Sequence, residues 1–276
     1  MIDAALVMQL RMLARAAAED ILQVYGAATT ETLALREKAD RSPLTAADLA
    51  AHRRLTAGLR RLTPDVPILS EEAADIPLAE RARWERFWLL DPLDGTREFL
   101  SRNGEFTVNI ALIEQGVPQF GLVHVPVGGR EYWGLPGIGA WRADSASADG
   151  SALSVAICSS DPIRVVGSRS HRGDSLDGFL LRLGPHALMT LGSSLKLCVL
   201  AEGGAEIYPR LGPTSQWDIA AGQAVLEGAG GRVCTLDGES LRYDPRADFL
   251  NPHFVAFGPN DRDWLGLLGQ RQREHT

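Results

Sequence analysis

Apolar positions near the N-terminus repeat with the spacing of an α-helix. They lie three or four residues apart, end at Gly26, and comprise Leu6, Leu10, Leu13, Ala17, Ile21 and Tyr25. This spacing predicts an amphipathic helix over residues 3–25 with a glycine at its C-terminus. A second helix is predicted from Thr45 to just before Pro64, because Thr45 and Asp48 resemble a capping box and leucines follow at helical spacing.

Beyond Pro64 the pattern changes to short apolar runs separated by turn residues, which is typical of buried β-strands. In the first half these runs are residues 68–69, 87–90, 107–113, 120–125 and a glycine-rich stretch over 132–141. The small, polar segment 143–151 is the best linker candidate.

After that segment, strand-like and helix-like stretches alternate. Strands are predicted at residues 163–166, 187–189, 206–208 and 232–235, and helices at residues 176–183, 194–202 and 218–227. The fold class is therefore expected to be α/β. We expect an α+β first domain over residues 1–146 and an α/β second domain over residues 147–276.

Composition narrows the classes of protein and partner. The chain has 276 residues, of which 45% are hydrophobic and 23% charged, and its net charge is −7 without a basic stretch. This is a globular composition, and it disfavours binding to polymeric nucleic acid, so we expect a small-molecule partner. The three cysteines lie far apart, which fits a reducing compartment. Neither a transmembrane run nor a signal-type N-terminus is present, so we expect a soluble intracellular protein.

Two apolar runs lead directly into carboxylates. PILSEE ends in Glu71 and Glu72, and FWLLDPLDGT delivers Asp91 and Asp94 around a stiffening proline. Carboxylates held close together repel one another unless a cation lies between them, and hard divalent cations prefer oxygen ligands, so magnesium is the natural candidate. The segment DPLDG alone would also fit an exposed β-turn, but the buried strand before it and the second acidic strand end favour a metal site.

Two further carboxylates remain ambiguous on local grounds. Asp218 stands at the start of a predicted helix in WDIAAG, where an acidic residue is favourable in any case. Asp48 is fully explained by the capping box without any chemistry.

Three of these segments together, SEE (70–72), DPLDGT (91–96) and WDIAAG (217–222), resemble the magnesium-dependent, lithium-sensitive phosphomonoesterases of the inositol monophosphatase family. Other segments are more similar to one branch of it, the bacterial 3′(2′),5′-bisphosphate nucleotidases: KADRSPLTAAD (38–48), RNGEFTVNIAL (102–112), SRSH (168–171), GSSLK (192–196), IYPR (207–210) and FLNPHF (249–254). The similarity runs from about residue 38 to residue 254. It implies a layered α-β-α-β-α sandwich of the inositol monophosphatase and fructose-1,6-bisphosphatase type.

The resemblance also implies roles for individual residues. The metal ligands would be Glu71, Asp91, Asp94, Asp218 and the backbone carbonyl of Leu93. The scissile phosphate would be held by Gly95 and Thr96, and Thr96 with Asp48 would orient and deprotonate the attacking water. The positions that match nucleotide contacts are His171, Ser193, Lys196 and Arg210. Glu72 matches an acid one layer behind the ligands.

The function implied is magnesium-dependent hydrolysis of the 3′-phosphate of adenosine 3′,5′-bisphosphate (PAP) to AMP and phosphate by metal-activated water, with two or three Mg²⁺ per site. The sulfated analogue PAPS is a further candidate substrate. The alternative is an inositol-1-monophosphatase or a broad sugar-phosphate phosphatase of the same superfamily. Family members are often dimers, which suggests a homodimer. We expect a cytoplasmic enzyme, and the resemblance leaves open a peripheral association with the inner face of the cell membrane.

Three rival classes fit the residues less well. Haloacid-dehalogenase phosphatases use D-x-D-x-T, whereas two residues separate Asp91 from Asp94. A serine acyl-enzyme would match Ser193-x-x-Lys196, but it expects a downstream K-T-G and no lysine follows Lys196. A non-catalytic binding module does not explain four separate acidic motif positions.

Overall fold

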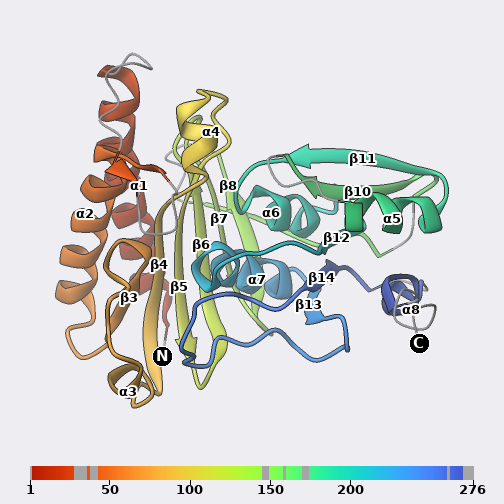
Figure 1. Ribbon diagram of the computed structural model, residues 1–276. Helices are drawn as coiled ribbons and strands as arrows, with labels where there is room; N and C mark the ends of the chain where they lie inside the picture. Colours follow the sequence, from red (N-terminus) through yellow and green to blue (C-terminus); the bar gives the residue numbers. More distant parts are fainter. Residues whose placement is uncertain are drawn as a thin grey trace.

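Five layers of secondary structure form the molecule, in the order helix, sheet, helix, sheet, helix (Figure 1). The computed structural model describes residues 2–27, 36–37, 43–144, 149–157, 160–169, 174–259 and 262–269. The expected α/β class and the α-β-α-β-α sandwich are confirmed. Among the described residues, no helix is both long enough and apolar enough to span a membrane.

The first layer consists of α1 (Ala4–Ala27) and α2 (Ala46–Leu62), which pack against one face of the first sheet. The apolar stripe predicted for α1 is buried there, and the helix continues one residue past Gly26. Thr45 and Asp48 form the predicted capping box of α2. Just before it, β1 (Arg36–Glu37) and β2 (Pro43–Leu44) form a short antiparallel pair.

The first sheet has seven strands in sequence order, parallel between the first two and antiparallel elsewhere. They are β3 (Ile68–Ser70), β4 (Arg86–Asp94), β5 (Thr107–Glu114), β6 (Val117–Val125), β7 (Arg130–Leu135), β8 (Gly139–Ala143) and β9 (Ser151–Ala152). Phe87 and Leu89 face the middle layer, whereas Trp88 and Leu90 face α1 and α2. Both faces of the sheet are therefore buried, which explains why β4 reads as a continuous apolar run.

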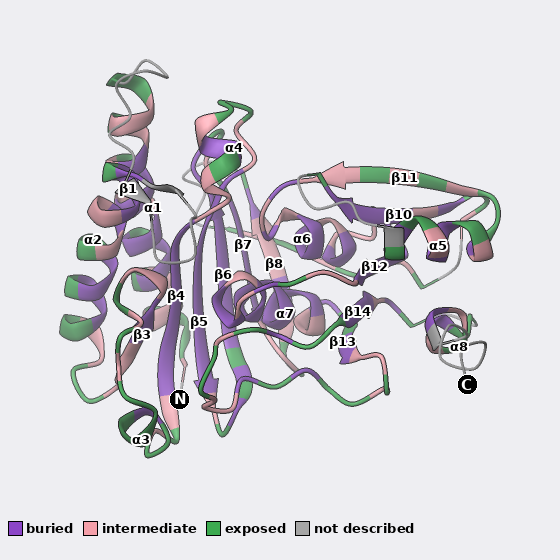
Figure 2. Ribbon diagram, viewed as in Figure 1, coloured by how far each residue is buried: buried purple, intermediate pink, exposed green. Residues whose placement is uncertain are grey.

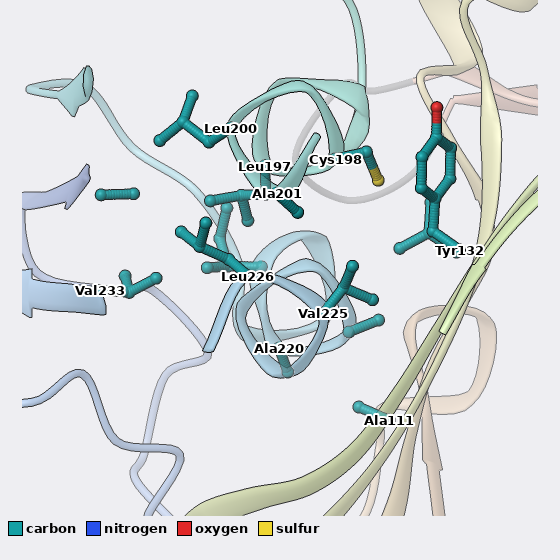
Figure 3. Close-up of a cluster of buried hydrophobic side chains, with 14 of the residues drawn as sticks. Ala111, Tyr132, Leu197, Cys198, Leu200, Ala201, Ala220, Val225, Leu226 and Val233 are labelled. Atoms are coloured by element: carbon teal, nitrogen blue, oxygen red, sulfur yellow. The ribbon is translucent and has the colours of Figure 1, made fainter. Parts of the chain in front are cut away.

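The middle layer contains α6 (Leu195–Ala201) and α7 (Gln216–Gly228), which are almost entirely buried between the two sheets (Figure 2). Figure 3 shows Ala220 and Val225 of α7 beside Leu197 of α6, between Ala111 of the first sheet and Val233 of the second. This core joins residues that are more than 100 positions apart in sequence. The middle helices are therefore held by apolar contact on both sides.

The second sheet has the strand order β11-β10-β12-β14-β13. Its strands are β10 (Ile163–Ser168), β11 (His186–Leu191), β12 (Ile207–Arg210), β13 (Arg232–Thr235) and β14 (Phe254–Phe257). Its outer face is covered by α5 (Asp174–Leu183) and α8 (Trp264–Gly269). The sequence pattern did not predict β14, because the FLNPHF segment marks only its beginning.

The middle of the predicted linker, residues 145–148, lies outside the described residues. The linker prediction for residues 143–151 was wrong at both ends, because Ala143 ends β8, Ser151 begins β9, and these strands pair with each other in the first sheet. In addition, α7 from the second half of the chain packs on β5, β6 and β7 of the first sheet. The division into domains 1–146 and 147–276 stays a prediction.

Candidate active site

A cavity of about 510 Å³ lies where the first sheet, the middle helices and the second sheet meet. Residues predicted from two distant parts of the chain line it together. They are Glu71, Asp91, Leu93, Asp94, Gly95 and Thr96 from the first half, and Ser193, Lys196, Arg210 and Asp218 from the second. The tertiary structure therefore brings ten of the predicted site residues to one place.

Three carboxylates form the centre of this cavity. Oxygens of Asp91, Asp94 and Asp218 all lie within 4.8 Å of one another. Asp91 and Asp94 come from the irregular end of β4, where the pairing with β5 shifts register, and Asp218 comes from the first turn of α7. Glu71, in the one-turn helix Glu71–Ala73 that follows β3, hydrogen-bonds to Asp91. The parallel pairing of β3 with β4 brings their acidic ends to the same sheet edge.

Burial and mutual repulsion raise the pKa values of the clustered carboxylates. Burial raises the pKa of Asp91 well above its usual value, and the negative charges of Glu71, Asp94 and Asp218 raise it further. The pKa of Asp218 is raised well above its usual value by the same causes, burial first. Grouped, buried carboxylates of this kind fit a hard divalent cation, whose charge would offset their repulsion. The residues present therefore suit the metal expected from the sequence.

The neighbours of Asp94 stabilise its charged form. Burial raises its pKa, but the positive charge of Lys196 and hydrogen bonds from Ser194 and Asn109 oppose the rise. Ser194 Oγ lies 2.8 Å from Asp94 Oδ2 and 2.7 Å from the carbonyl oxygen of Asp218, and Asn109 Nδ2 donates to Ser194 Oγ at 2.8 Å. Ser194 thus links two of the three clustered residues.

The sequence analysis quoted the segments of Ser194 and Asn109 without assigning these two residues a role. A signal for Asn109 was available, since a polar side chain between Val108 and Ile110 interrupts a fully buried strand. Ser194 stands beside Ser193, and only the structure shows that Ser194 is the one that contacts the acidic cluster.

The turn after β4 presents backbone to the cavity. The side chain of Leu93 is buried on the α1–α2 side, so its main chain faces the acidic cluster. Gly95 has φ +90°, a left-handed conformation that a residue with a Cβ adopts only with strain. Thr96 then begins the short helix α4 (Thr96–Leu100) at the cavity wall. The residues at the start of α4, Gly95 and Thr96, thus line the cavity.

Asp48 is buried one layer away, and the cavity lining described above does not include it. Its Oδ2 accepts hydrogen bonds from the backbone N–H and the hydroxyl of Thr45, as the capping box requires. The strand before Thr45, β2, lies against α4. The carboxylate is therefore fixed at the start of α2, just after the strand that lies against α4.

Two cations line the cavity and are largely buried. Lys196 Nζ donates to the carbonyl oxygen of Ser193, and burial lowers the pKa of this lysine to about 8, with Asp94 opposing the shift. Arg210 Nη2 donates to the carbonyl oxygen of Pro213 at 2.6 Å. The positive charge of Lys196 also acts on Asp94, because α6 is packed between the two sheets.

One buried hydroxyl in the cavity wall, Ser193 Oγ, makes no hydrogen bond within the described residues. Ser193 also has φ +43°, which is unusual for a residue with a side chain. Unpartnered buried donors are costly, so this wall is suited to a polar ligand.

Two predicted residues lie outside this geometry. His171 falls outside the described residues. Glu72 lies next to Glu71, and its charge raises the pKa of His52 against the lowering effect of burial. The expected role of Glu72 behind the metal ligands stays a prediction.

Comparisons with known proteins agree with one another. A model of the inositol monophosphatase family matches residues 5–275. The 3′(2′),5′-bisphosphate nucleotidase CysQ of Salmonella typhimurium is 50% identical over 247 residues, covering 89% of this chain and 97% of the relative. The CysQ nucleotidase of Buchnera aphidicola is 39% identical over 247 residues, covering 88% and 90%.

Solved structures give the same result. CysQ from Bacteroides thetaiotaomicron, a bacterial member of the inositol monophosphatase family, superposes with a TM-score of 0.78 at 37% identity, covering 91% of this chain and 96% of that one. Inositol monophosphatase from Anabaena superposes with a TM-score of 0.70 at 24% identity over 95% and 94%, a likeness of fold alone.

Proposed function

The chain belongs to the inositol monophosphatase family, and we propose that it is a 3′(2′),5′-bisphosphate nucleotidase that removes the 3′-phosphate from PAP. The observation that carries this is the 50% identity to a named nucleotidase over 97% of that relative's length. By contrast, the inositol monophosphatases from Anabaena and Thermotoga maritima, both of known structure, are 24% and 22% identical to this chain. The monophosphatase alternative is therefore not favoured.

For the cofactor we propose two or three Mg²⁺. Glu71, Asp91, Asp94 and Asp218 would hold them with their carboxylates, and Leu93 with its carbonyl oxygen. When bound, the ions supply positive charge that neutralises phosphoryl oxygens and makes water more acidic. The support for this is the mutual approach of three carboxylates to within 4.8 Å and their raised pKa values.

The chain's own groups position the reactants. The backbone N–H groups at Gly95 and Thr96 point from the start of α4 and suit the oxygens of the scissile phosphate. The Thr96 hydroxyl orients the attacking water, and Asp48, held by Thr45, accepts its proton. The water oxygen then bonds to phosphorus as the bond from phosphorus to the ribose 3′-oxygen breaks, and that oxygen takes a proton from solvent to become the 3′-hydroxyl of AMP.

The second phosphate of PAP needs its own cationic partner, because the acidic cluster and its metals serve only the phosphate being cleaved. Lys196, from α6, and Arg210, at the end of β12, line the same cavity. Ser193 offers an unpartnered hydroxyl beside them. We assign these three residues, with His171, to the nucleotide and its 5′-phosphate.

The test is phosphate release from PAP, PAPS, inositol 1-phosphate and fructose 1,6-bisphosphate, each with Mg²⁺ and with EDTA. We expect PAP to have the highest kcat/KM and EDTA to abolish release. Highest kcat/KM on inositol 1-phosphate would establish the monophosphatase alternative, and full activity in EDTA would contradict the metal mechanism.

Two finer proposals rest on family resemblance, namely a homodimer and peripheral association with the inner face of the cell membrane. Light scattering after size exclusion measures the mass in solution, and co-sedimentation with anionic lipid vesicles measures membrane binding. A mass of one chain, or no protein in the vesicle pellet, would contradict the respective proposal.

A further inference from the structure

Glu105 connects the first half of the chain to Gly192, which lines the active-site cavity. It lies between α4 and β5, in the first half of the chain. Its Oε2 accepts a hydrogen bond from the backbone N–H of Gly192 at 2.7 Å and from Nε of Arg169 at 3.0 Å. Its Oε1 accepts from Arg169 Nη2 at 2.6 Å. One carboxylate thus makes three hydrogen bonds to the second half.

These partners belong to the edge of the second sheet that faces the site. Arg169 directly follows β10, and its Nη2 also donates to the carbonyl oxygen of Thr190 in β11 at 3.1 Å. Gly192 directly follows β11 and begins the turn into α6. The Glu105 carboxylate therefore binds the residues that directly follow two neighbouring strands, β10 and β11.

The turn that Glu105 holds fits closely against the first half of the chain. A Cβ on Gly192 would lie 2.5 Å from Glu98 Cγ and 2.9 Å from the carbonyl oxygen of Glu105. On the other side of the turn, Ser193 Cβ would lie 3.3 Å from a Cβ on Gly95. The position of this turn is thus sensitive to small displacements.

The same turn carries two contacts of the catalytic cluster. Ser194, two residues after Gly192, hydrogen-bonds to Asp94, and the carbonyl oxygen of Ser193 accepts from Lys196. A shift of Gly192 would move Ser194 relative to Asp94, which is fixed to β4. Partners behind metal ligands set the orientation of those ligands.

We propose that Glu105 is a positioning residue for the hydrolysis, acting through Gly192 and Ser194 on the orientation of Asp94. Its carboxylate fixes the turn at residues 192–194 against the first sheet, so that ligands contributed by both halves of the chain keep their relative geometry. Arg169 holds the carboxylate in the orientation that faces Gly192. This proposal rests on the proposed function for its activity measurements, and on the metal site alone for its binding measurement.

The test compares Glu105→Ala, Glu105→Gln and Arg169→Ala with the wild type. Glu105→Ala removes all three hydrogen bonds, whereas Glu105→Gln keeps an oxygen for the N–H of Gly192. For Glu105→Ala we expect kcat on PAP to fall ~10-fold or more, as misplacement by about 1 Å can do. We expect Glu105→Gln to retain most of the wild-type kcat, and Arg169→Ala to lie between the two.

The second measurement is the Mg²⁺ concentration that gives half of the metal-induced rise in melting temperature, which requires no substrate. Glu105→Ala should raise it about 3- to 10-fold, less than the loss seen for groups that contact a ligand directly. The control is Asp244→Asn, which breaks another exposed bidentate pair, with Arg242, and should leave both quantities unchanged.

A Glu105→Ala variant with wild-type kcat and wild-type Mg²⁺ response would overturn the proposal. So would a variant that melts lower in EDTA but is otherwise unchanged, because Glu105 would then stabilise the fold alone. If the wild type releases no phosphate from PAP, the proposed function fails, and the Mg²⁺ titration still decides the role of Glu105.

Discussion

A Cβ added to Gly121 would lie 2.1 Å from the carbonyl oxygen of Ala221, so the backbone of α7 rests directly on the first sheet. Gly134, paired with Gly121 across β6 and β7, makes a similar approach, and its Cβ would lie 2.5 Å from Val225 Cα. Because α7 carries Asp218 in its first turn, these glycines set how near Asp218 comes to the aspartates of β4. The packing of α7 on the first sheet therefore also sets the geometry of the acidic cluster.

Replacing Gly121 should therefore damage both stability and the site. Gly121→Ala forces α7 away from the sheet, and we expect it to lower the free energy of unfolding by at least about 2 kcal/mol. It should also weaken the Mg²⁺-induced rise in melting temperature. Gly26→Ala is the matched control, since a Cβ there meets nothing within 4 Å and alanine favours the helix. Equal stability of the two variants in urea would contradict the close contact.

Removing the charge of Asp91 should raise the stability of the metal-free protein and lower its activity. Because burial and neighbouring carboxylates raise its pKa, the charged form destabilises the metal-free fold at neutral pH. Asp91→Asn should thus melt higher than the wild type in EDTA, yet gain less from Mg²⁺ and lose at least ~10²-fold in kcat. Asp94→Asn should lose a similar factor. Melting curves in EDTA and in Mg²⁺, with kcat on the same samples, check this, and an unchanged kcat would refute it.

The roles of Asp48 and Thr96 can be separated from helix capping. If they activate water, Asp48→Asn and Thr96→Ala should lower kcat by ~10²–10⁴ with metal binding preserved. If Asp48 only completes the capping box of α2 and Thr96 only begins α4, each variant should cost at most about 1 kcal/mol of stability and leave turnover nearly intact. Thr45→Ala is the control for Asp48, because it removes the capping hydroxyl but leaves the Asp48 carboxylate held by the backbone N–H of residue 45. It should lose stability but keep most of the turnover.

Lys196 and Arg210 should distinguish a bisphosphate from a monophosphate. We expect Lys196→Ala and Arg210→Ala to raise KM for PAP ~10-fold or more, as for the loss of a charge-assisted phosphate contact. KM for inositol 1-phosphate, which has no second phosphate, should barely change. Arg232→Ala, an exposed cation on the second sheet, serves as the control. Equal effects on both substrates would indicate a folding defect, and no effect on either would support the monophosphatase alternative.

Glu227, near the end of α7, should make stability depend on pH. Burial raises its pKa to about 7, against a hydrogen bond from Gln223 that lowers it. A carboxyl with a raised pKa binds more protons when folded, so its contribution is favourable at low pH and is lost between pH 4.5 and about 7. Glu227→Gln should gain about 1–3 kcal/mol over the wild type at pH 8 and little at pH 4.5. Urea unfolding at both pH values measures this, and a pH-independent difference would contradict it.

Several contacts of the site were beyond the reach of sequence reasoning. The hydrogen bonds from Ser194 to Asp94, from Gly192 to Glu105 and from Asn109 to Ser194 each join residues more than 80 positions apart. No local pattern encodes such a contact, because it arises only when the two sheets close on the middle helices. The same closure brings the positive charge of Lys196 to bear on Asp94.

The sequence by itself determined the local elements and the candidate chemistry. The helical repeat predicted α1, the capping box predicted the start of α2, and strands leading into Asp91 and Glu71 predicted an acidic edge. These features depend on neighbouring residues, whose spacing fixes which face is apolar. The tertiary structure alone decided that 143–151 joins two strands of one sheet, and that Asp218 completes a cluster with Asp91 and Asp94. The physical reason is that close approach between distant segments depends on packing across the layers, down to glycines that leave room for a carbonyl oxygen.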